Sequence, residues 1–340
     1  MAIERLELEN FTVYESLEAS FDSGINVLIG ENGSGKTHVM KILHSACQAT
    51  DPGMSFTYKL VRTMLPDDYK VSRLIRRRQG NQVTKVKVIA SEAGKKKTIS
   101  TEFNIKTKKW EAPVKGEDTW ERDLKSLSSI FIPAKEILSN SYNLGAAVDK
   151  NNVRFDDTYI DIINSAKIDI SVGRNTAEKE RQLNRIESIT EGKTYYDPKE
   201  DEFYLKIGNS KQEFNLVAEG IRKMALLWQL IKNGALEKGT VLFWDEPEAN
   251  INPLHIPVIA ELLLELQRNG VQVFVATHDY MLAKYFEVKK KEGDSVRFHS
   301  FYKEDNQVKY EFGDRFGSLK HNTITEAFNK LLDEIYDMGE

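Results

Sequence analysis

Eight residues, from Gly30 to Thr37, combine three glycines with a lysine and a threonine in the spacing G-x-x-x-x-G-K-[ST]. Glycine lets a backbone turn tightly and approach an anion without a Cβ in the way. The amides of such a loop cradle phosphate oxygens, and the helix that follows adds the positive end of its dipole. We therefore interpret the segment as a phosphate-binding loop rather than as a glycine-rich turn.

The last two residues of the loop have distinct expected roles. Lys36 is expected to reach the β- and γ-phosphates of ATP, and the Thr37 hydroxyl is expected to ligate Mg²⁺, a hard cation that prefers oxygen. The other residues expected to bind ATP belong to the loop or follow it directly: Gly30, Asn32, Gly33, Ser34, Gly35 and His38.

Two adjacent carboxylates follow an apolar segment in "VLFWDEPEANINP". Carboxylates at the end of a core strand are costly unless they face a crevice or a metal. We expect Asp245 to support the Mg²⁺ ion and Glu246 to orient and polarise the attacking water. A solvated turn would explain an isolated Asp-Glu pair, but the phosphate loop upstream favours a catalytic site.

A histidine, His278, follows a further apolar segment in "VQVFVATHD". From the end of a strand it could contact the γ-phosphate and respond to its loss. A lone histidine is more often structural, so its position after the other motifs is what favours a role in the site.

The order of these motifs resembles that of the ABC-type ATPase heads of the RecF, SMC and OLD-like branch. Within that branch the chain is similar to a stand-alone AAA-family ATPase. The segments "GENGSGKT", "LVAEGIRK", "FWDEPEANINP" and "VATHD" carry the resemblance. It implies an α/β fold: a P-loop ABC-ATPase head with a mixed core sheet, an antiparallel β subdomain and a helical signature lobe. The expected single domain has residues 1–133 and 235–312 as its core lobe, 134–234 as its signature lobe and 313–340 as a C-terminal helix.

The resemblance also implies how the site works. Two heads would sandwich two ATP molecules, which makes the chain a homodimer or a higher oligomer. Glu246 would be the catalytic base and His278 the switch. The signature presented to the partner's nucleotide would be Ala218, Glu219 and Gly220, and the D-loop at the interface would contain Glu248, Asn250 and Asn252.

The chain departs from this pattern at three places. Ala218 replaces the usual signature serine, which removes a hydroxyl but leaves the helix amides. No glutamine follows "SSIFIP" where the Q-loop is expected, and Lys135 or Glu136 could replace it. Asn252 takes a position where related proteins often have a histidine.

Alternating and apolar segments predict the elements that position these residues. The strands and hairpins are expected at 3–11, 16–30, 82–107, 126–133, 193–208, 239–244, 271–277 and 296–312, and the helices at 37–48, 175–192, 219–234, 252–270 and 322–338. Residues 51–72 cannot be assigned, and 134–172 are expected to be irregular.

Composition limits the functional class. The 340 residues include one cysteine, Cys47, so no internal disulfide framework can form, which suits a reducing compartment. No apolar run approaches the ~18 residues of a membrane span, so a cytoplasmic protein without membrane contact is expected. Residues 73–109 carry twelve Lys/Arg against two acids, whereas the whole chain has a net charge of −4. This basic region could contact nucleic acid or an acidic partner, or could be the solvated face of a hairpin.

Three functions remain open. The first is a dimeric ATP-gated switch that controls a separately encoded effector, an expectation from family analogy to anti-phage defence. The second is a RecF-like DNA-repair clamp, and the third is a scaffold that binds ATP without hydrolysing it. Only 62 residues follow His278, too few for the nuclease domain of OLD proteins, so the chain itself is not expected to be a nuclease.

Overall fold

The structure is a computed structural model that describes residues 1–77, 82–125, 127–150, 153–170 and 173–339. Its central sheet contains β3 (Ile25–Gly30), β7 (Ser129–Ile132), β11 (Val241–Asp245), β12 (Gln272–Ala276), β13 (Val296–Glu304) and β14 (Gln307–Gly313). The strand order is β14-β13-β3-β12-β11-β7, and every pair is parallel except β13 with β14. This mixed sheet confirms the predicted fold class.

The central strands are apolar because both faces of the sheet are covered. Strands β3 and β12 are buried along their whole length. Alternate side chains enter two separate hydrophobic cores: Trp244 belongs to one and Phe243 to the other. The carboxyl ends of β3, β11 and β12 share one edge of the sheet, so the polar segments that follow them are brought together there.

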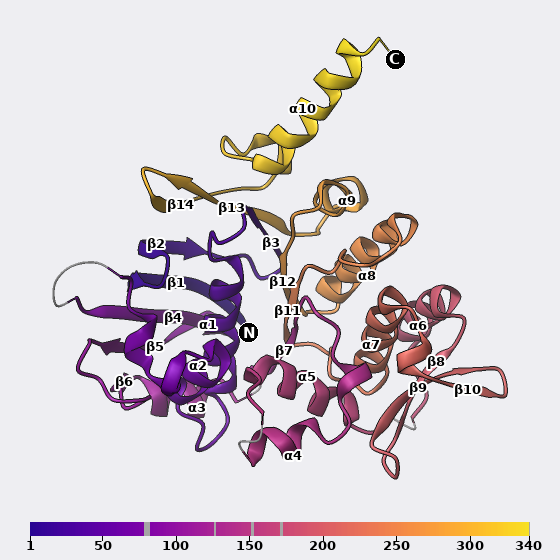
Figure 1. Ribbon diagram of the computed structural model, residues 1–340, viewed down its shortest axis with the longest axis horizontal. Helices are drawn as coiled ribbons and strands as arrows, with labels where there is room; N and C mark the ends of the chain where they lie inside the picture. Colours follow the sequence, from indigo (N-terminus) through magenta and orange to yellow (C-terminus); the bar gives the residue numbers. More distant parts are fainter. Residues whose placement is uncertain (78–81, 126, 151–152, 171–172, 340) are drawn as a thin grey trace.

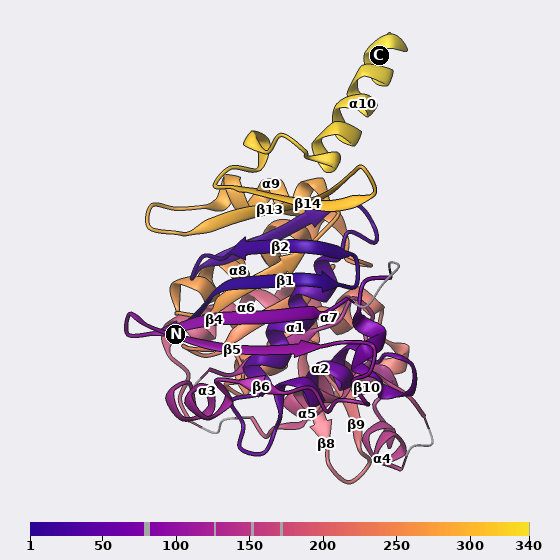
Figure 2. The same cartoon turned by 90° about the vertical axis from the view of Figure 1, so that its left-hand side faces the viewer.

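A second, antiparallel sheet covers one face and has the order β2-β1-β4-β5-β6. Its strands are β1 (Ala2–Phe11), β2 (Tyr14–Ser20), β4 (Thr84–Glu92), β5 (Lys95–Phe103) and β6 (Val114–Lys115). Figure 2 shows these strands side by side. The basic hairpin predicted from the sequence is β4–β5, and β4 pairs with the acidic strand β1 along most of its length.

The helices divide between the two cores. Those packed with the antiparallel sheet are α1 (Lys36–Gln48), α2 (Phe56–Met64) and α3 (Glu117–Asp123). Those in the other core are α5 (Asp157–Lys167), α6 (Ala177–Thr190), α7 (Glu219–Lys232), α8 (Ile256–Arg268) and α9 (Tyr280–Lys289). The short helix α4 (Leu144–Asp149) and a small sheet of β8 (Lys193–Asp197), β9 (Glu202–Ile207) and β10 (Ser210–Glu213) lie beside this second group (Figure 1).

Several expectations about local structure were wrong. The segment 134–172 contains α5, whose first turn is capped by the Asp156 carboxylate, so its aspartates are helix and network residues rather than signs of irregular chain. The unassigned segment 51–72 contains α2, and α9 was missed. The helix expected from Asn252 begins later: the short 3₁₀ turn Pro253–His255 precedes α8. Other 3₁₀ turns are Asp67–Tyr69, Val71–Leu74, Leu138–Asn140, Phe214–Leu216 and Phe316–Ser318.

The C-terminal helix α10 (Thr323–Asp337) projects away from the body, beyond the β13–β14 hairpin (Figures 1 and 2). Its first turns are held by the buried side chain of Ile324 and by Phe328, whose ring stacks on Tyr280 with centroids 4.1 Å apart. Within the described ranges, no helix has both the length and the apolar character needed to span a bilayer.

Candidate nucleotide-binding site

A cavity of about 190 Å³ lies at the carboxyl edge of the central sheet. Its described lining comprises Val13, Asn32, Gly33, Gly35, Lys36, Thr37, His38, Asp245, Glu246 and His278. The structure therefore brings the phosphate loop, the acidic pair and the histidine into one cavity. Val13, from the turn between β1 and β2, was missed because a lone valine gives no chemical signal in the sequence.

Two glycines of the loop occupy positions that a larger residue would disturb. Gly30 has φ +139°, and a Cβ there would overlap the carbonyl oxygen of Phe301. Gly35 has φ +93°, and a Cβ there would overlap the buried ring of Tyr14. The loop can pass this closely over the sheet only because it carries no side chains at these points. Ser34 is fully buried, so it supports the loop from within.

Lys36 is 6% exposed, and its Nζ donates hydrogen bonds to the carbonyl oxygens of Gly30 at 2.8 Å and Glu31 at 3.1 Å. Burial lowers the pKa of Lys36 to about 8, against the opposing effect of nearby carboxylates. Its only hydrogen-bond partners among the described residues are neutral carbonyls. The charge of this lysine is therefore available to a phosphate.

Thr37 and Asp245 form a pair of residues suited to binding a metal ion. The Thr37 hydroxyl donates to Asp245 Oδ2 at 2.9 Å, although the two residues are 208 positions apart. Burial raises the pKa of Asp245, and the hydrogen bond from Thr37 only partly offsets this effect. A divalent cation would favour the ionised carboxylate. The oxygen donors fit Mg²⁺, which typically takes one or two protein ligands and completes its shell with phosphates and water.

The Glu246 main chain is held in an uncommon conformation, with φ +47°. For a residue with a side chain, this left-handed region costs roughly 1–2 kcal/mol. Its amide donates to the Ala276 carbonyl of β12 at 2.9 Å. The carboxylate lines the cavity and accepts no hydrogen bond from the described residues, so it is free to accept one from water.

His278 lies at the mouth of the cavity and is largely exposed. Partial burial, followed by the charge of Lys36, lowers the pKa of His278, so its ring is neutral at neutral pH. Its amide donates to Glu248 Oε1 at 3.2 Å, and the Thr277 hydroxyl donates to the same oxygen at 2.7 Å. Within one head the Glu248 carboxylate anchors the histidine loop, and the assignment of this residue to the D-loop stays a prediction.

The remaining D-loop residues differ from one another. Asn250 is exposed, with φ +63°. Asn252 uses its side chain to accept a hydrogen bond from the Leu254 amide at 3.0 Å, so it caps the following 3₁₀ turn.

His38 is hydrogen-bonded to Thr12 at 3.0 Å, and burial lowers its pKa to about 4, so its side chain is neutral and holds the β1–β2 turn.

The signature segment lies at the start of α7, outside the cavity. Ala218 precedes the first turn and Glu219 begins it. A Cβ on Gly220 would overlap the Asn250 carbonyl, so the signature and the D-loop are in direct contact. None of these three signature residues is among the described residues that line the cavity.

Neither candidate for the missing glutamine lines the cavity among the described residues. Glu136 forms an ion pair with Arg222 of α7 at 2.7 Å, and its side chain is 1% exposed. This carboxylate therefore joins the signature helix to the segment after β7, and the residue that replaces the Q-loop glutamine stays a prediction.

Lys223 is a residue of the site region that the sequence analysis did not select. It lies on α7, is 1% exposed, and donates to the carbonyls of Ala249 at 2.9 Å and Glu246 at 3.3 Å. Burial lowers its pKa. A usable signal was its position at the start of the buried run "KMALLWQL", where a charge needs a polar partner.

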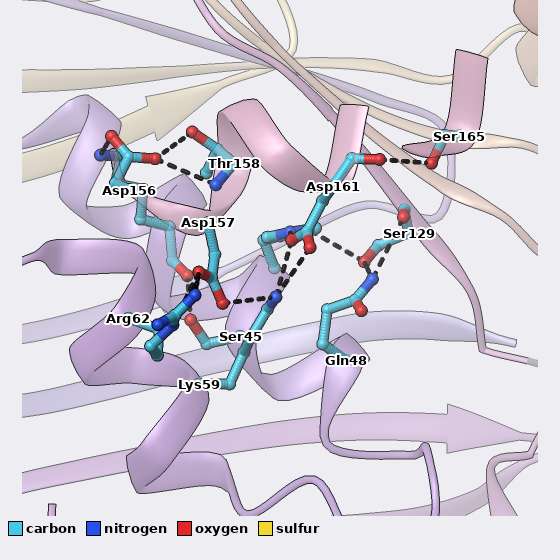
Figure 3. A network of polar contacts seen from close by, with 12 residues as sticks. Ser45, Gln48, Lys59, Arg62, Ser129, Asp156, Asp157, Thr158, Asp161 and Ser165 are labelled. Atoms are coloured by element: carbon cyan, nitrogen blue, oxygen red, sulfur yellow. Dashed lines mark hydrogen bonds and ion pairs between the residues drawn. The ribbon is translucent and has the colours of Figure 1, made fainter. Parts of the chain in front are cut away.

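A buried charge cluster lies behind the phosphate loop, where α1, α2, α5 and β7 meet (Figure 3). Lys59 is 3% exposed and forms ion pairs with Asp157 at 3.0 Å and Asp161 at 2.8 Å. The fully buried His44 is hydrogen-bonded to Asp161 and to Ser129, each at 2.9 Å. The remaining pairs are Arg62 with Asp157 and Lys41 with Asp156, both at 2.9 Å.

The described basic residues of region 73–109 are spread along the β4–β5 hairpin and the segments that flank it. Arg76 lies beside the start of β4, where its guanidinium donates to the Val13 carbonyl, whereas Lys95 pairs with Glu92 at the other end of the strand. Eight residue steps separate these ends, about 27 Å at ~3.4 Å per residue. Arg78, which belongs to the same predicted surface, lies outside the described residues.

Many charges of this region are also matched by the chain's own acids. The ion pairs are Lys85 with Glu9 at 2.8 Å, Lys87 with Glu7 at 3.1 Å, Lys96 with Glu4 at 3.0 Å, and Lys97 with Asp123. Four of the twelve basic side chains of this region are therefore paired with acids of the neighbouring strand and helix.

The family comparison covers most of this architecture. Residues 25–283 match the family described as an AAA domain, putative AbiEii toxin, type IV TA system. The chain belongs to this AAA-domain family. Residues 1–48 of this AAA-domain protein also match the model described as an AAA ATPase domain.

Curated relatives share shorter segments. The AAA-domain protein is 32% identical over 100 residues to the DNA replication and repair protein RecF of Ligilactobacillus salivarius, which is 29% of this chain and 26% of that protein. It is 52% identical over 44 residues to RecF of Oceanobacillus iheyensis, 13% of this chain and 12% of that protein. The chain thus spans about a quarter, or less, of the length of these relatives.

Solved structures support the fold over nearly the whole chain. An SmcHead structure bound to the C-winged helix domain of ScpA matches with TM-score 0.62 and 14% identity, over 92% of this chain and 98% of that one. An Smc head with an extended coiled coil, bound to the C-terminal domain of ScpA derived from Pyrococcus furiosus, matches with TM-score 0.55 and 13% identity, over 98% and 99%. The chain therefore has the fold of an Smc head, as the resemblance to ABC-type ATPase heads predicts.

Proposed function

We propose that the protein is an ATP-hydrolysing dimeric switch. The observation that carries this proposal is the Thr37–Asp245 hydrogen bond, which joins the phosphate loop to the acidic segment inside the cavity that Glu246 lines. One side of the cavity offers amides and a lysine to phosphates, and the other offers carboxylates to a metal ion and to water. These are the parts that phosphoryl transfer to water requires.

The roles of the residues follow from their positions. Lys36 exchanges its two loop carbonyls for phosphate oxygens, which carry more negative charge. Thr37 and Asp245 hold Mg²⁺, which neutralises charge on the phosphates. Glu246 accepts a proton from the attacking water, and His278 donates a hydrogen bond to a γ-phosphate oxygen from the mouth of the cavity.

A second copy of the chain completes the site in this proposal. Ala218, Glu219 and Gly220 begin a helix whose amides suit a phosphate, yet they lie outside their own cavity. Two heads related by a two-fold axis would present each signature to the other's nucleotide. Residues 1–133 and 235–312 serve as the core lobe, 134–234 as the signature lobe and 313–340 as a C-terminal appendage.

The test is Glu246→Gln. The amide keeps the shape of the side chain but cannot accept a proton, so turnover should fall about 10²-fold or more, the usual scale for removal of a general base. ATP should still bind, and the variant should accumulate as an ATP-dependent dimer in sedimentation velocity. Turnover near the wild-type rate would assign the base to another residue, and an ATP-loaded monomer would refute the dimer.

The proposed biological role is control of a separately encoded effector in anti-phage defence. Its support is the family description, which names a putative AbiEii toxin of a type IV TA system. The test is phage survival in cells carrying the gene with its neighbours, wild type against Lys36→Ala. Protection that is independent of Lys36 would contradict the role.

The alternative function, a DNA clamp, is favoured by similarity to proteins named for DNA replication and repair. The pairing of basic side chains on β4 and β5 by the chain's own acids argues against it.

A further inference from the structure

Lys223 lies where the signature helix and the D-loop, two segments of the proposed dimer site, meet within one head. It is on the signature helix α7, one turn after Gly220 and on the same face. This face contacts the D-loop twice: Gly220 packs against the Asn250 carbonyl, and Lys223 donates to the Ala249 carbonyl at 2.9 Å. The second acceptor of Lys223, at 3.3 Å, is the carbonyl of Glu246 itself.

The Glu246 peptide is therefore held from two sides. Its amide donates to Ala276 of β12, and its carbonyl accepts from Lys223 of α7. The residue has φ +47°, a conformation that persists only where its surroundings enforce it. The carboxylate has no hydrogen bond of its own among the described residues, so its position in the cavity depends on how the main chain is held.

We propose that Lys223 is a positioning residue, which transmits the position of the signature helix to the catalytic carboxylate of Glu246 in the same head. This inference rests on the proposed ATPase dimer. Helix α7 is buried along one continuous segment, Lys223 to Ile231, so its first turn and its buried segment belong to one packed helix. A shift of its first turn, caused by the partner's nucleotide, moves the Lys223 ammonium and with it the Glu246 carbonyl.

The chemistry of Lys223 suits this role better than a purely structural one. Both of its acceptors are main-chain carbonyls, and nearby carboxylates such as Glu219 and Glu248 affect its charge without bonding it. Carbonyl contacts can be lengthened or exchanged at a smaller cost than a buried ion pair. The Glu246 carbonyl also accepts from the Ala249 amide at 3.1 Å, so the turn keeps one hydrogen bond when Lys223 is removed.

The first measurement compares Lys223→Met with Lys223→Arg and a matched control, Lys232→Met. Methionine keeps most of the length without the charge. Lys232 is on the same helix, far from the cavity, and donates to the Asn175 side chain at 3.0 Å. We expect Lys223→Met to bind ATP as the wild type does but to lose about 10²-fold in kcat, the scale of a misplaced catalytic group. Lys223→Arg should restore part of the rate, and Lys232→Met should leave it unchanged.

The second measurement asks on which head Lys223 acts. A small amount of the chain under test is mixed with a large molar excess of Glu246→Gln, so that nearly every tested chain pairs with an inactive partner. Turnover by limiting Lys223→Met should be about 10²-fold below that of limiting wild type. Turnover by limiting wild type should not change when the excess chain carries Lys223→Met in addition to Glu246→Gln.

The outcomes separate the two proposals. A loss in the second mixture alone would place the action of Lys223 on the partner's site, equal losses in both would place it on both heads, and no loss in either would remove its role; each overturns the inference. If Glu246→Gln forms no ATP-dependent dimer, the dimer proposal fails, and the kcat of Lys223→Met in the monomer still decides whether Lys223 positions Glu246.

Discussion

Lys36 and Lys59 are both buried lysines, but they have opposite kinds of partner. Lys36 is 6% exposed and, among the described residues, donates only to carbonyl oxygens. Lys59 is 3% exposed and lies between the carboxylates of Asp157 and Asp161. Burying a charge is costly in either place, and only the second place offsets the cost within the folded chain. The first leaves a charge for a ligand to satisfy.

A single helix joins the phosphate loop around Lys36 to the charge cluster around Lys59. Helix α1 begins at the phosphate loop, and its later residues Lys41 and His44 belong to the charge cluster in Figure 3. The cluster fastens α5 to α1 and α2 through matched charges. This attachment at the later turns of α1 holds the start of the helix in place, and with it the phosphate loop, whose lysine is hydrogen-bonded to neutral carbonyls.

The largest effect is expected for Lys36→Ala. The substitution removes the ammonium group, which exchanges its carbonyl partners for phosphate oxygens when ATP binds. Charge-assisted hydrogen bonds contribute about 1.5–3 kcal/mol each. ATP binding should fall below detection in isothermal titration calorimetry, while the melting temperature should change little. Unchanged affinity for ATP would remove the assignment of the phosphate loop.

Lys59→Met should give the opposite result. It leaves Asp157 and Asp161 buried with fewer cations, and breaking a buried ion pair typically costs about 3–5 kcal/mol. We expect a large loss in the free energy of unfolding, measured with urea, and little change in the ATP affinity of the folded protein. A variant that is as stable as the wild type but fails to bind ATP would reverse the comparison.

A weaker, graded effect is expected from pH, because burial lowers the pKa of Lys36 to about 8. Phosphate stabilises the charged lysine, so ATP affinity should fall as pH rises above about 8, by up to about tenfold per unit, since one proton is lost in this range. In the protein without nucleotide, the free energy of unfolding changes with pH in the opposite direction. The unfolded lysine titrates near 10.4, so this group's contribution to stability rises between about pH 8 and 10.4.

Calorimetry in two buffers of different ionisation enthalpy measures this effect directly. Binding of ATP near pH 8 should be accompanied by uptake of a fraction of a proton. Lys59→Met is the matched control and should show the same uptake. No proton uptake at this pH would contradict the lowered pKa of Lys36.

The sequence predicted the parts of the site that depend on local spacing. Lys36 and Thr37 are fixed by a loop motif, and Asp245, Glu246 and His278 follow apolar strands whose carboxyl ends meet at one edge of the sheet. Contacts between distant segments were not predictable. Lys223 reaches carbonyls of another loop, and carbonyl acceptors leave no trace in side-chain chemistry.

Charge was the least reliable guide to the fold and its surfaces. The acidic segment 134–172 was interpreted as irregular, yet Asp156 caps α5, and Asp157 and Asp161 pair with basic residues of α2. The basic run 73–109 was considered as one surface, and four of its lysines pair with acids that lie outside the run. Net charge along the sequence does not reveal which charges the fold brings together.

The smallest effect is expected where basic side chains already have acidic partners. Lys96 pairs with Glu4 at 3.0 Å and Lys97 pairs with Asp123, so two of the three positive charges lost when Lys95, Lys96 and Lys97 are reversed to glutamate are already matched by acids. Labelled duplex DNA should be titrated at two salt concentrations, with wild type and this triple variant. We expect weak binding by both and a change in salt slope below about one unit, the amount that a single phosphate contact contributes. Turnover of ATP should be unchanged, because these residues lie outside the cavity. Tight wild-type binding with a steep salt dependence, lost in the variant, would show that these lysines exchange their acidic partners for phosphates, and would favour the clamp over the switch.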